Sequence, residues 1–276
     1  MTREADPSLR AFMATKLEAP GDIEAAWRRV LIEGHRQMRV ARLLFQYLPG
    51  PPRCKVCNSP FDGIGGRLVG VLGFHRSRKN PNLCNQCCES LPPGGAEVDI
   101  AVLFADVRGS TAMAEKLGAS AFAERMNRFY RTATDVLVRH DAIIDKLVGD
   151  EVMALFIPGM CGQSYRQRAA EAALALLSAV SDGPEASEVP VGVAVNCGLA
   201  YVGNVGSADV TDFTALGDMV NTAARLASSA GAGELLLTEP VYAAIRERHP
   251  LAETRSLALR GKEAEVAVHV ARLPLS

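Results

Sequence analysis

Three things are scarce in this chain of 276 residues: aromatic side chains, long apolar runs and net charge. Aromatic residues make up 5% of the sequence and do not interleave with the basic residues, so a nucleic-acid-binding surface is not indicated. No apolar run approaches the roughly 20 residues of a membrane-spanning helix, and the first residues lack the apolar core of a signal peptide. We therefore predict a cytoplasmic protein that has no membrane span and binds no nucleic acid.

The formal net charge of −1 hides two parts of opposite charge. Residues 1–95 hold 14 Lys and Arg against 8 Asp and Glu, whereas the remaining residues hold 16 against 23. This pattern indicates a basic N-terminal part followed by an acidic C-terminal domain. We divide the chain into an N-terminal helical segment (1–52), a cysteine-rich module with its linker (53–95) and a C-terminal domain (96–276).

The N-terminal segment has the apolar periodicity of a helix. From Trp27 to Leu48, apolar or small residues recur at alternating spacings of four and three, which predicts one helix from about residue 21 to residue 47. The Pro-Gly-Pro-Pro sequence at 49–52 ends it. Such a helix either packs on its own domain or pairs with a second copy as a short coiled coil.

The seven cysteines include two Cys-x-x-Cys pairs with 26 residues between them. Paired thiolates of this kind hold a tetrahedral Zn²⁺ ion in structural sites, although the gap here is longer than usual. Four cysteines can also carry an iron–sulfur cluster, or no metal at all. The candidate ligands are Cys54, Cys57, Cys84 and Cys87, whereas His75 between the pairs is interpreted as an ordinary loop residue.

From residue 98 onward, strand-like and helix-like patterns alternate and include tight strand–strand connections. This order favours an α+β sandwich over a purely parallel, doubly wound sheet. Strands are predicted over 98–105, 142–148, 152–156, 191–199, 212–216, 235–237, 255–259 and 265–271, and helices over 111–139, 167–180, 219–229 and from 239 onward.

Two aspartates stand at the ends of apolar, strand-like runs. Asp106 follows such a run directly, and Asp150 lies in a turn in which Gly149 permits the backbone geometry. If the two strands are neighbours, the carboxylates meet at one edge of the sheet and can hold a pair of divalent cations against a triphosphate. The helix start after Asp106 offers backbone N–H groups to the same anion, at Gly109, Ser110 and Thr111.

A third segment adds an amide and a guanidinium. Asn221 and Arg225 are four residues apart, so they share one face of a predicted helix. An amide there suits the orientation of a ribose, and a guanidinium suits the neutralisation of phosphate charge.

Taken together, these segments resemble the catalytic domain of class III nucleotidyl cyclases, the adenylate and guanylate cyclase family. The resemblance covers residues 98–271, and its motifs follow the family's order: LFADVRGST, DKLVGDEVMALF, GNVG and FTALGDMVNTAARL. It implies a ferredoxin-like sandwich with a βααβ-type core.

The resemblance also implies a role for each matching residue. Asp106, Asp150 and the Val107 carbonyl would bind two Mg²⁺ or Mn²⁺ ions. In the same way, the substrate residues would be Lys146 and Thr214 at the base, Asn221 at the ribose, Arg225 at the phosphates, and either Arg260 or Lys262 at the terminal phosphates.

Thr214 departs from the aspartate that many adenylate cyclases of the family carry, and it resembles class IIIb, which includes bicarbonate-responsive members. A hydroxyl can accept a hydrogen bond from the adenine amino group, so ATP is the expected substrate and cyclic AMP with pyrophosphate the expected products. The alternatives are a pseudocyclase that senses nucleotide or metal without turnover, a guanylate cyclase and, less favoured, a diguanylate cyclase.

Finally, the spacing of Lys146 and Asp150 implies a homodimer. The two residues are four apart on one predicted hairpin, yet they would contact opposite ends of the nucleotide. They can serve only if they belong to different sites, each shared between two copies of the chain. We expect the N-terminal module to regulate turnover by positioning this dimer.

Overall fold

The computed structural model describes residues 20–272, apart from 35, 55, 78–82, 91–93, 183–188, 207–210, 251–252 and 263. The chain divides into two compact units. The first comprises Met1–Val98 together with Tyr201–Ala215, and the second comprises Asp99–Ala200 together with Leu216–Ser276. The hairpin segment 201–215 therefore groups with the N-terminal part of the chain.

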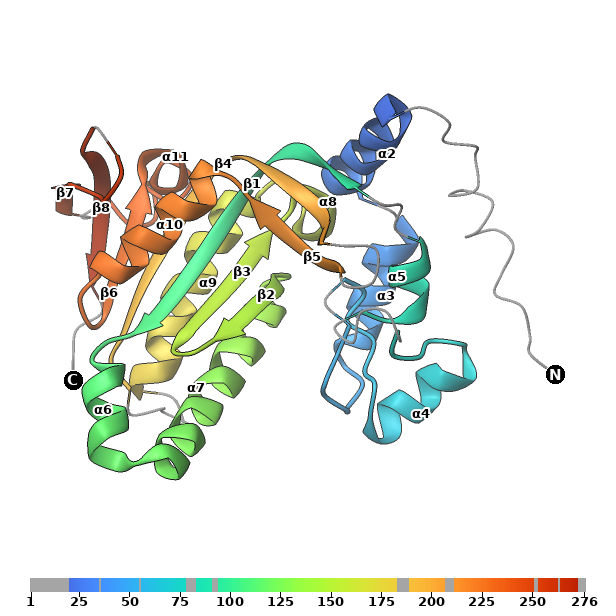
Figure 1. The fold of residues 1–276 in the computed structure, drawn as a ribbon. Coiled ribbons are helices and arrows are strands. Elements are labelled where there is room, and N and C mark those ends of the chain that lie inside the picture. Colours follow the sequence, from blue (N-terminus) through green and yellow to red (C-terminus); the bar gives the residue numbers. More distant parts are fainter. Residues whose placement is uncertain are drawn as a thin grey trace. The chain divides into compact units, whose positions relative to one another are not determined.

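The described strands form an eight-stranded mixed sheet, which confirms the α+β prediction (Figure 1). The strand order is β2-β3-β1-β4-β6-β8-β7, and β5 pairs with β4. Of the printed pairings, β4 with β6 is parallel and the other pairs are antiparallel. The strands are β1 (Gly94–Val107), β2 (Ile143–Val148), β3 (Glu151–Phe156), β4 (Val191–Gly206), β5 (Thr211–Leu216), β6 (Glu234–Thr238), β7 (Glu253–Leu257) and β8 (Val266–Arg272).

Strand β1 lies in the interior of the sheet, between β3 and β4, and its apolar run is covered on both faces. Residues 100–105 are all buried, a pattern typical of a central strand. Its C-terminal end runs antiparallel to β3, with Asp106 opposite Glu151. The tight turn between β2 and β3 therefore lies beside the end of β1.

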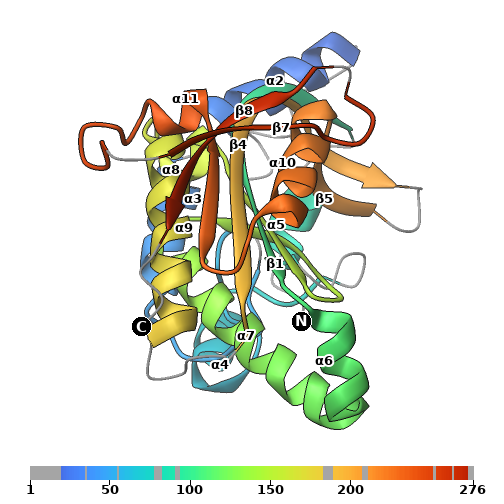
Figure 2. The same cartoon turned by 90° about the vertical axis from the view of Figure 1, so that its left-hand side faces the viewer.

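Helices of the second unit cover both faces of its strands (Figure 2). α7 and α9 pack on each other and share one apolar core with β1, β3, β4 and β6, whereas α10 lies on the other side. The single helix predicted over 111–139 is wrong, because Gly118 has a φ of 77° and separates two helices. The helices are α6 (Ser110–Leu117), α7 (Ala119–Arg139), α8 (Pro158–Cys161), α9 (Tyr165–Asp182), α10 (Asp218–Ser229) and α11 (Glu239–Tyr242).

The first unit also contains two helices where one was predicted. Gly34 has a φ of 69°, and its N–H bonds the Val30 carbonyl at 3.0 Å, so the first helix ends there. None of the helices in the described part of the chain is long and apolar enough to cross a membrane. The helices of this unit are α2 (Pro20–Glu33), α3 (Arg36–Phe45), α4 (Gly63–Val71) and α5 (Asn85–Ser90).

The apolar seam of the N-terminal segment packs within its own unit. Trp27 and Leu31 of α2 are 1% and 0% exposed, so the interpretation as packing within one domain holds for this helix. The Trp27 indole stacks on Phe213 of β5, with ring centroids 6.1 Å apart. A side chain at Gly95 of β1 would collide with the Val202 carbonyl, 2.4 Å from its Cβ. α2, β1 and the β4–β5 hairpin are therefore tightly packed.

Candidate active site

The two aspartates meet at one edge of the sheet, as predicted. Asp106 lies near the C-terminal end of β1, and Asp150 lies in the turn between β2 and β3, where Gly149 has a φ of 65°. The Val107 N–H donates to the Asp150 carbonyl at 3.1 Å and ties the end of β1 to this turn. Both carboxylates belong to the second unit and are partly exposed.

A third carboxylate, Glu151, joins the pair. Burial raises the pKa of Glu151, and the charges of Asp106 and Asp150 raise it further. Burial likewise raises the pKa of Asp106, which Arg108 lowers and Asp150 raises. Glu151 was not among the predicted site residues, and its only signal in the sequence is its place directly after Asp150. Oxygen ligands that repel one another in this way fit a divalent cation, the group that the sequence predicts here.

Neighbouring polar groups hold the turn in place. The Ser110 hydroxyl at the start of α6 donates to the Asp150 carboxylate, and the Tyr130 hydroxyl donates to the Gly149 carbonyl at 2.6 Å. The preceding Gly109 has a φ of 70°, a conformation that favours glycine. The Gly109 carbonyl accepts the Met113 N–H at 3.0 Å, which is the first backbone hydrogen bond of α6. The N–H groups of Ser110 and Thr111 come before it and therefore take no part in the hydrogen bonds within the helix.

A second group of predicted residues gathers on α10. Asn221 and Arg225 lie on this helix. The Arg225 guanidinium lies close to the loop residue Gly261: a Cβ atom added at Gly261 would be 3.5 Å from Arg225 Nη2. In the same loop, the Lys262 ammonium pairs with Asp218 at the start of α10. Arg260, the other basic candidate of this loop, is exposed.

The two predicted base-recognition residues lie in different units. Lys146 is exposed on β2, on the same hairpin as Asp150 in the second unit. Thr214 is 4% exposed on β5, in the first unit, and directly follows Phe213. The structure thus gathers the metal-binding candidates at the end of β1 and the phosphate-binding candidates on α10.

The four cysteines of the two Cys-x-x-Cys pairs come together in the first unit. All four are buried, and their sulfur atoms lie within 4.8 Å of one another. The Sγ atoms of Cys57 and Cys84 are 3.6 Å apart, too far for a disulfide. A tetrahedral site with metal–sulfur distances of about 2.3 Å has sulfur–sulfur edges of about 3.8 Å. The cluster therefore fits a single metal ion.

Backbone hydrogen bonds and thiol chemistry support this fit. The Cys84 N–H donates to Cys54 Sγ at 3.2 Å, and the Cys87 N–H donates to Cys84 Sγ at 3.3 Å. Burial opposes ionisation of Cys54, but hydrogen bonds from the other three thiols outweigh it and lower its pKa. The Cys87 pKa is raised because its thiol donates to Cys54. A bound cation would stabilise all four thiolates at once.

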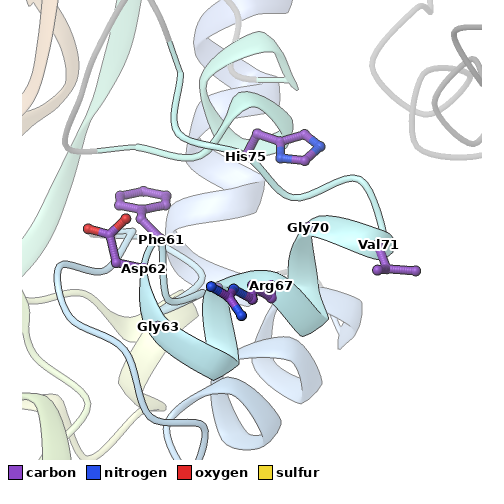
Figure 3. Close-up of a pocket in the computed structure, with 8 residues that line it drawn as sticks. Phe61, Asp62, Gly63, Arg67, Gly70, Val71 and His75 are labelled. Carbon is purple, nitrogen blue, oxygen red and sulfur yellow. The ribbon is translucent and has the colours of Figure 1, made fainter.

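The same module carries a surface cavity of about 610 Å³ that contains no predicted catalytic residue. Figure 3 shows it along α4, with Phe61 and Asp62 at one end of the helix, Val71 at the other, and His75 on a segment across from the helix. His75 is exposed and is not part of the cysteine cluster, which agrees with its interpretation as a loop residue. The lining residues are Phe61, Asp62, Gly63, Gly66, Arg67, Gly70, Val71 and His75.

A sheet in which the carboxylate at the end of β1 meets the carboxylate of the neighbouring β2–β3 turn, together with a helix that carries Asn and Arg, has the architecture of a nucleotidyl cyclase. Comparison with known proteins agrees with this class. The chain belongs to the adenylate and guanylate cyclase catalytic-domain family, whose sequence model matches residues 96–271.

Individual relatives support the family and show its fold. Rv1319c of Mycobacterium tuberculosis, an uncharacterized protein, is 34% identical over 206 residues, which is 72% of this chain and 36% of that protein. The chain thus spans about a third of this relative's length. The crystal structure of the adenylyl cyclase CyaB from P. aeruginosa is 27% identical with a TM-score of 0.57, covering 64% of this chain and 95% of that one. The guanylyl cyclase Cya2 matches in fold, with a TM-score of 0.59 at 24% identity over 64% of this chain and 93% of that one.

Proposed function

We propose that this protein is an adenylate cyclase that converts ATP to 3′,5′-cyclic AMP and pyrophosphate. The observation that carries the choice of base is the pair Lys146 and Thr214 at the two specificity positions. A lysine donates to the N1 acceptor of adenine, and a hydroxyl accepts from its amino group. Guanine presents an N–H at the same place as adenine N1, which a lysine cannot accept.

The reaction joins the ribose 3′-oxygen to the α-phosphorus and releases pyrophosphate. Asp106, Asp150 and the Val107 carbonyl would hold two divalent cations, Mg²⁺ or Mn²⁺. These cations would lower the pKa of the ribose 3′-hydroxyl and supply positive charge at the leaving pyrophosphate. Asn221 orients the ribose, and Arg225 neutralises charge that develops on the phosphates. The backbone N–H groups at 109–111 meet the phosphates at the start of α6.

Of the two basic candidates for the terminal phosphates, we favour Lys262. Its ammonium already lies at α10 through the ion pair with Asp218, on the helix that carries Asn221 and Arg225. Its side chain is 26% exposed, so it is partly ordered before substrate arrives. Arg260 faces solvent in the same loop.

We further propose a homodimer with two shared sites. Lys146 and Asp150 lie on one hairpin, and they cannot both serve the same nucleotide. Large apolar side chains around this hairpin and near α10 are exposed, which is typical of a surface that a partner covers. Within the second unit they are Leu147 (43%), Val148 (61%), Leu199 (68%) and Leu216 (46%).

We also propose that the cysteine module holds a structural Zn²⁺ ion. Four buried thiolates leave no open position for substrate, which is typical of structural zinc. A polynuclear iron–sulfur cluster needs its thiolates further apart, because several iron and sulfide ions lie between them. The contact of Trp27 with Phe213, beside Thr214, supports a role for the N-terminal part of the chain in regulating base binding.

The direct test is to incubate purified protein with ATP or GTP, each with Mg²⁺ or Mn²⁺, and to identify the products by chromatography. We expect cyclic AMP from ATP, and little cyclic GMP from GTP. Production of mainly cyclic GMP would favour the guanylate cyclase alternative, and binding without turnover would favour the pseudocyclase. The same sample should be colourless and contain one zinc per chain; a brown, iron-containing protein would contradict the zinc assignment.

A further inference from the structure

Arg108 lies between the metal-binding carboxylates and the C-terminal end of α10. Its guanidinium forms an ion pair with the Asp106 carboxylate, and its Nε donates to the Asp106 carbonyl at 3.3 Å. Its Nη1 donates to the Ser228 carbonyl at 2.8 Å. Its own N–H donates to the Pro190 carbonyl at 2.7 Å, so the main chain is fixed as well as the side chain.

Two features favour the positive charge of Arg108 at this position: the nearby carboxylates and the C-terminal end of α10. Asp106, Asp150 and Glu151 bring three carboxylates together, and Arg108 contributes a positive charge to them. The side chains of the ion pair are only 23% and 16% exposed, so their attraction is screened less than that of a surface pair. Ser228 lies in the last turn of α10, where the helix dipole also favours a cation.

We propose that Arg108 is a positioning residue that acts as an internal cation, competing with the divalent cation for Asp106. This inference rests on the proposed function of Asp106 as a metal ligand. When a metal ion takes the carboxylate, the guanidinium keeps its bond to the Ser228 carbonyl and remains beside α10. Arg108 thereby joins Asp106 to the helix that carries Asn221 and Arg225.

In the proposed dimer, this link has a consequence for cooperativity. Asp106 of one chain serves one site, whereas Asn221 and Arg225 of the same chain serve the other. Metal binding at one site would thus remove the Asp106 partner of Arg108, leave the guanidinium held by the Ser228 carbonyl alone, and so loosen the link to α10 at the second site.

The test measures Mn²⁺ binding to nucleotide-free protein by electron paramagnetic resonance of the free ion. We expect Arg108→Ala to bind Mn²⁺ about three- to tenfold more tightly than the wild type, since a competing cation is removed. Arg108→Lys, which keeps the charge, should stay near the wild-type affinity. Arg108→Gln keeps a donor for the Ser228 carbonyl but removes the charge, so it should also bind Mn²⁺ more tightly than the wild type. This variant replaces Arg108→Ala in the test if the alanine variant folds poorly.

Arg168→Ala is the matched control, because it removes another partly buried ion pair, with Asp141, at 2.7 Å and away from the carboxylates. Its Mn²⁺ affinity should not change. Unchanged or weaker binding in both the Ala and Gln variants of Arg108 would overturn the proposal. Asp106→Asn, made in the otherwise wild-type chain, should weaken Mn²⁺ binding. If it does not, Asp106 is not a metal ligand, and the proposed competition between Arg108 and the metal ion is wrong as well.

Discussion

At the scale of single residues, the Glu234 carboxylate at the start of β6 is neutralised by two arginines. Its carboxylate accepts from the Arg255 guanidinium at 3.0 and 3.2 Å, from Arg272 and from the Gly231 N–H at 2.8 Å. The hydrogen bond from Arg255 is the main cause that lowers the pKa of Glu234 to about 2, with burial acting against it. This cluster joins β6, β7 and β8 and plays no part in the proposed chemistry.

Replacing Glu234 by Gln should therefore reduce stability in a pH-dependent way. The folded pKa lies below the ordinary value of about 4.3, so the carboxylate stabilises the fold above pH 4.3 and loses this effect as the pH falls towards 2. We expect Glu234→Gln to lower the free energy of unfolding by about 1–3 kcal/mol at pH 7 and by less at pH 3. Urea denaturation at pH 7, 4 and 3 measures both.

Glu253→Gln serves as the control, since the Glu253 side chain is 48% exposed and should contribute little. Equal losses in the two variants, or a Glu234→Gln loss that does not shrink at low pH, would contradict the assignment.

At the scale of elements, much of the second unit can be predicted from the sequence. Buried runs such as 100–105 predict strands, and the order of motifs places Asp106 and Asp150 at one sheet edge, as the structure has them. The predicted helix boundaries are wrong at Gly34 and Gly118, where one predicted helix is two in the structure. An isolated glycine inside a helical pattern does not reveal that its φ is positive.

Contacts between distant segments are the part that periodicity cannot predict. Nothing in the local sequence pairs Trp27 with Phe213, or Arg108 with the Ser228 carbonyl, since both contacts join residues far apart in the chain. The cysteine cluster is different, because the Cys-x-x-Cys spacing itself indicates which four side chains converge.

The contact between α2 and β5 yields the second prediction. Trp27→Ala removes the ring that covers Phe213, so β5 and the adjoining Thr214 should be held less firmly. We expect the free energy of unfolding to fall by about 3–5 kcal/mol. The preference of kcat/KM for ATP over GTP should fall about tenfold, equivalent to about 1.4 kcal/mol. Thermal unfolding and steady-state kinetics with both nucleotides give these values.

Two further variants separate packing from base recognition. Leu31→Ala leaves a cavity in the same helix and should destabilise the protein without changing nucleotide preference. Trp27→Phe keeps a ring and removes an indole N–H that is buried with no hydrogen-bond partner among the described residues, so it should restore the preference. An equal change of preference in Trp27→Ala and Leu31→Ala would refute the link.

At the scale of the whole molecule, shared sites predict complementation between inactive variants. Asp106→Ala and Arg225→Ala should each be inactive alone, because each removes a residue from both sites of its homodimer. A random mixture should recover roughly a quarter of wild-type activity, since half the dimers are mixed and each has one intact site. Cyclic AMP formation after co-refolding or subunit exchange measures this.

The control mixes Asp106→Ala with Asp150→Ala. Both residues belong to the metal half of a site, so the mixed dimer has no intact site and activity should not return. Recovery in this control, or none with Arg225→Ala, would exclude the shared-site arrangement.

The grouping of residues 201–215 with the N-terminal part bears on how this protein can be divided into fragments. The family match begins at residue 96, yet the hairpin inside it that carries Phe213 and Thr214 shares a compact unit with residues before that point. A fragment that starts at residue 96 would strip Trp27 from Phe213 and leave an apolar surface bare. The hairpin that carries Thr214 therefore depends on residues before the family match for its packing.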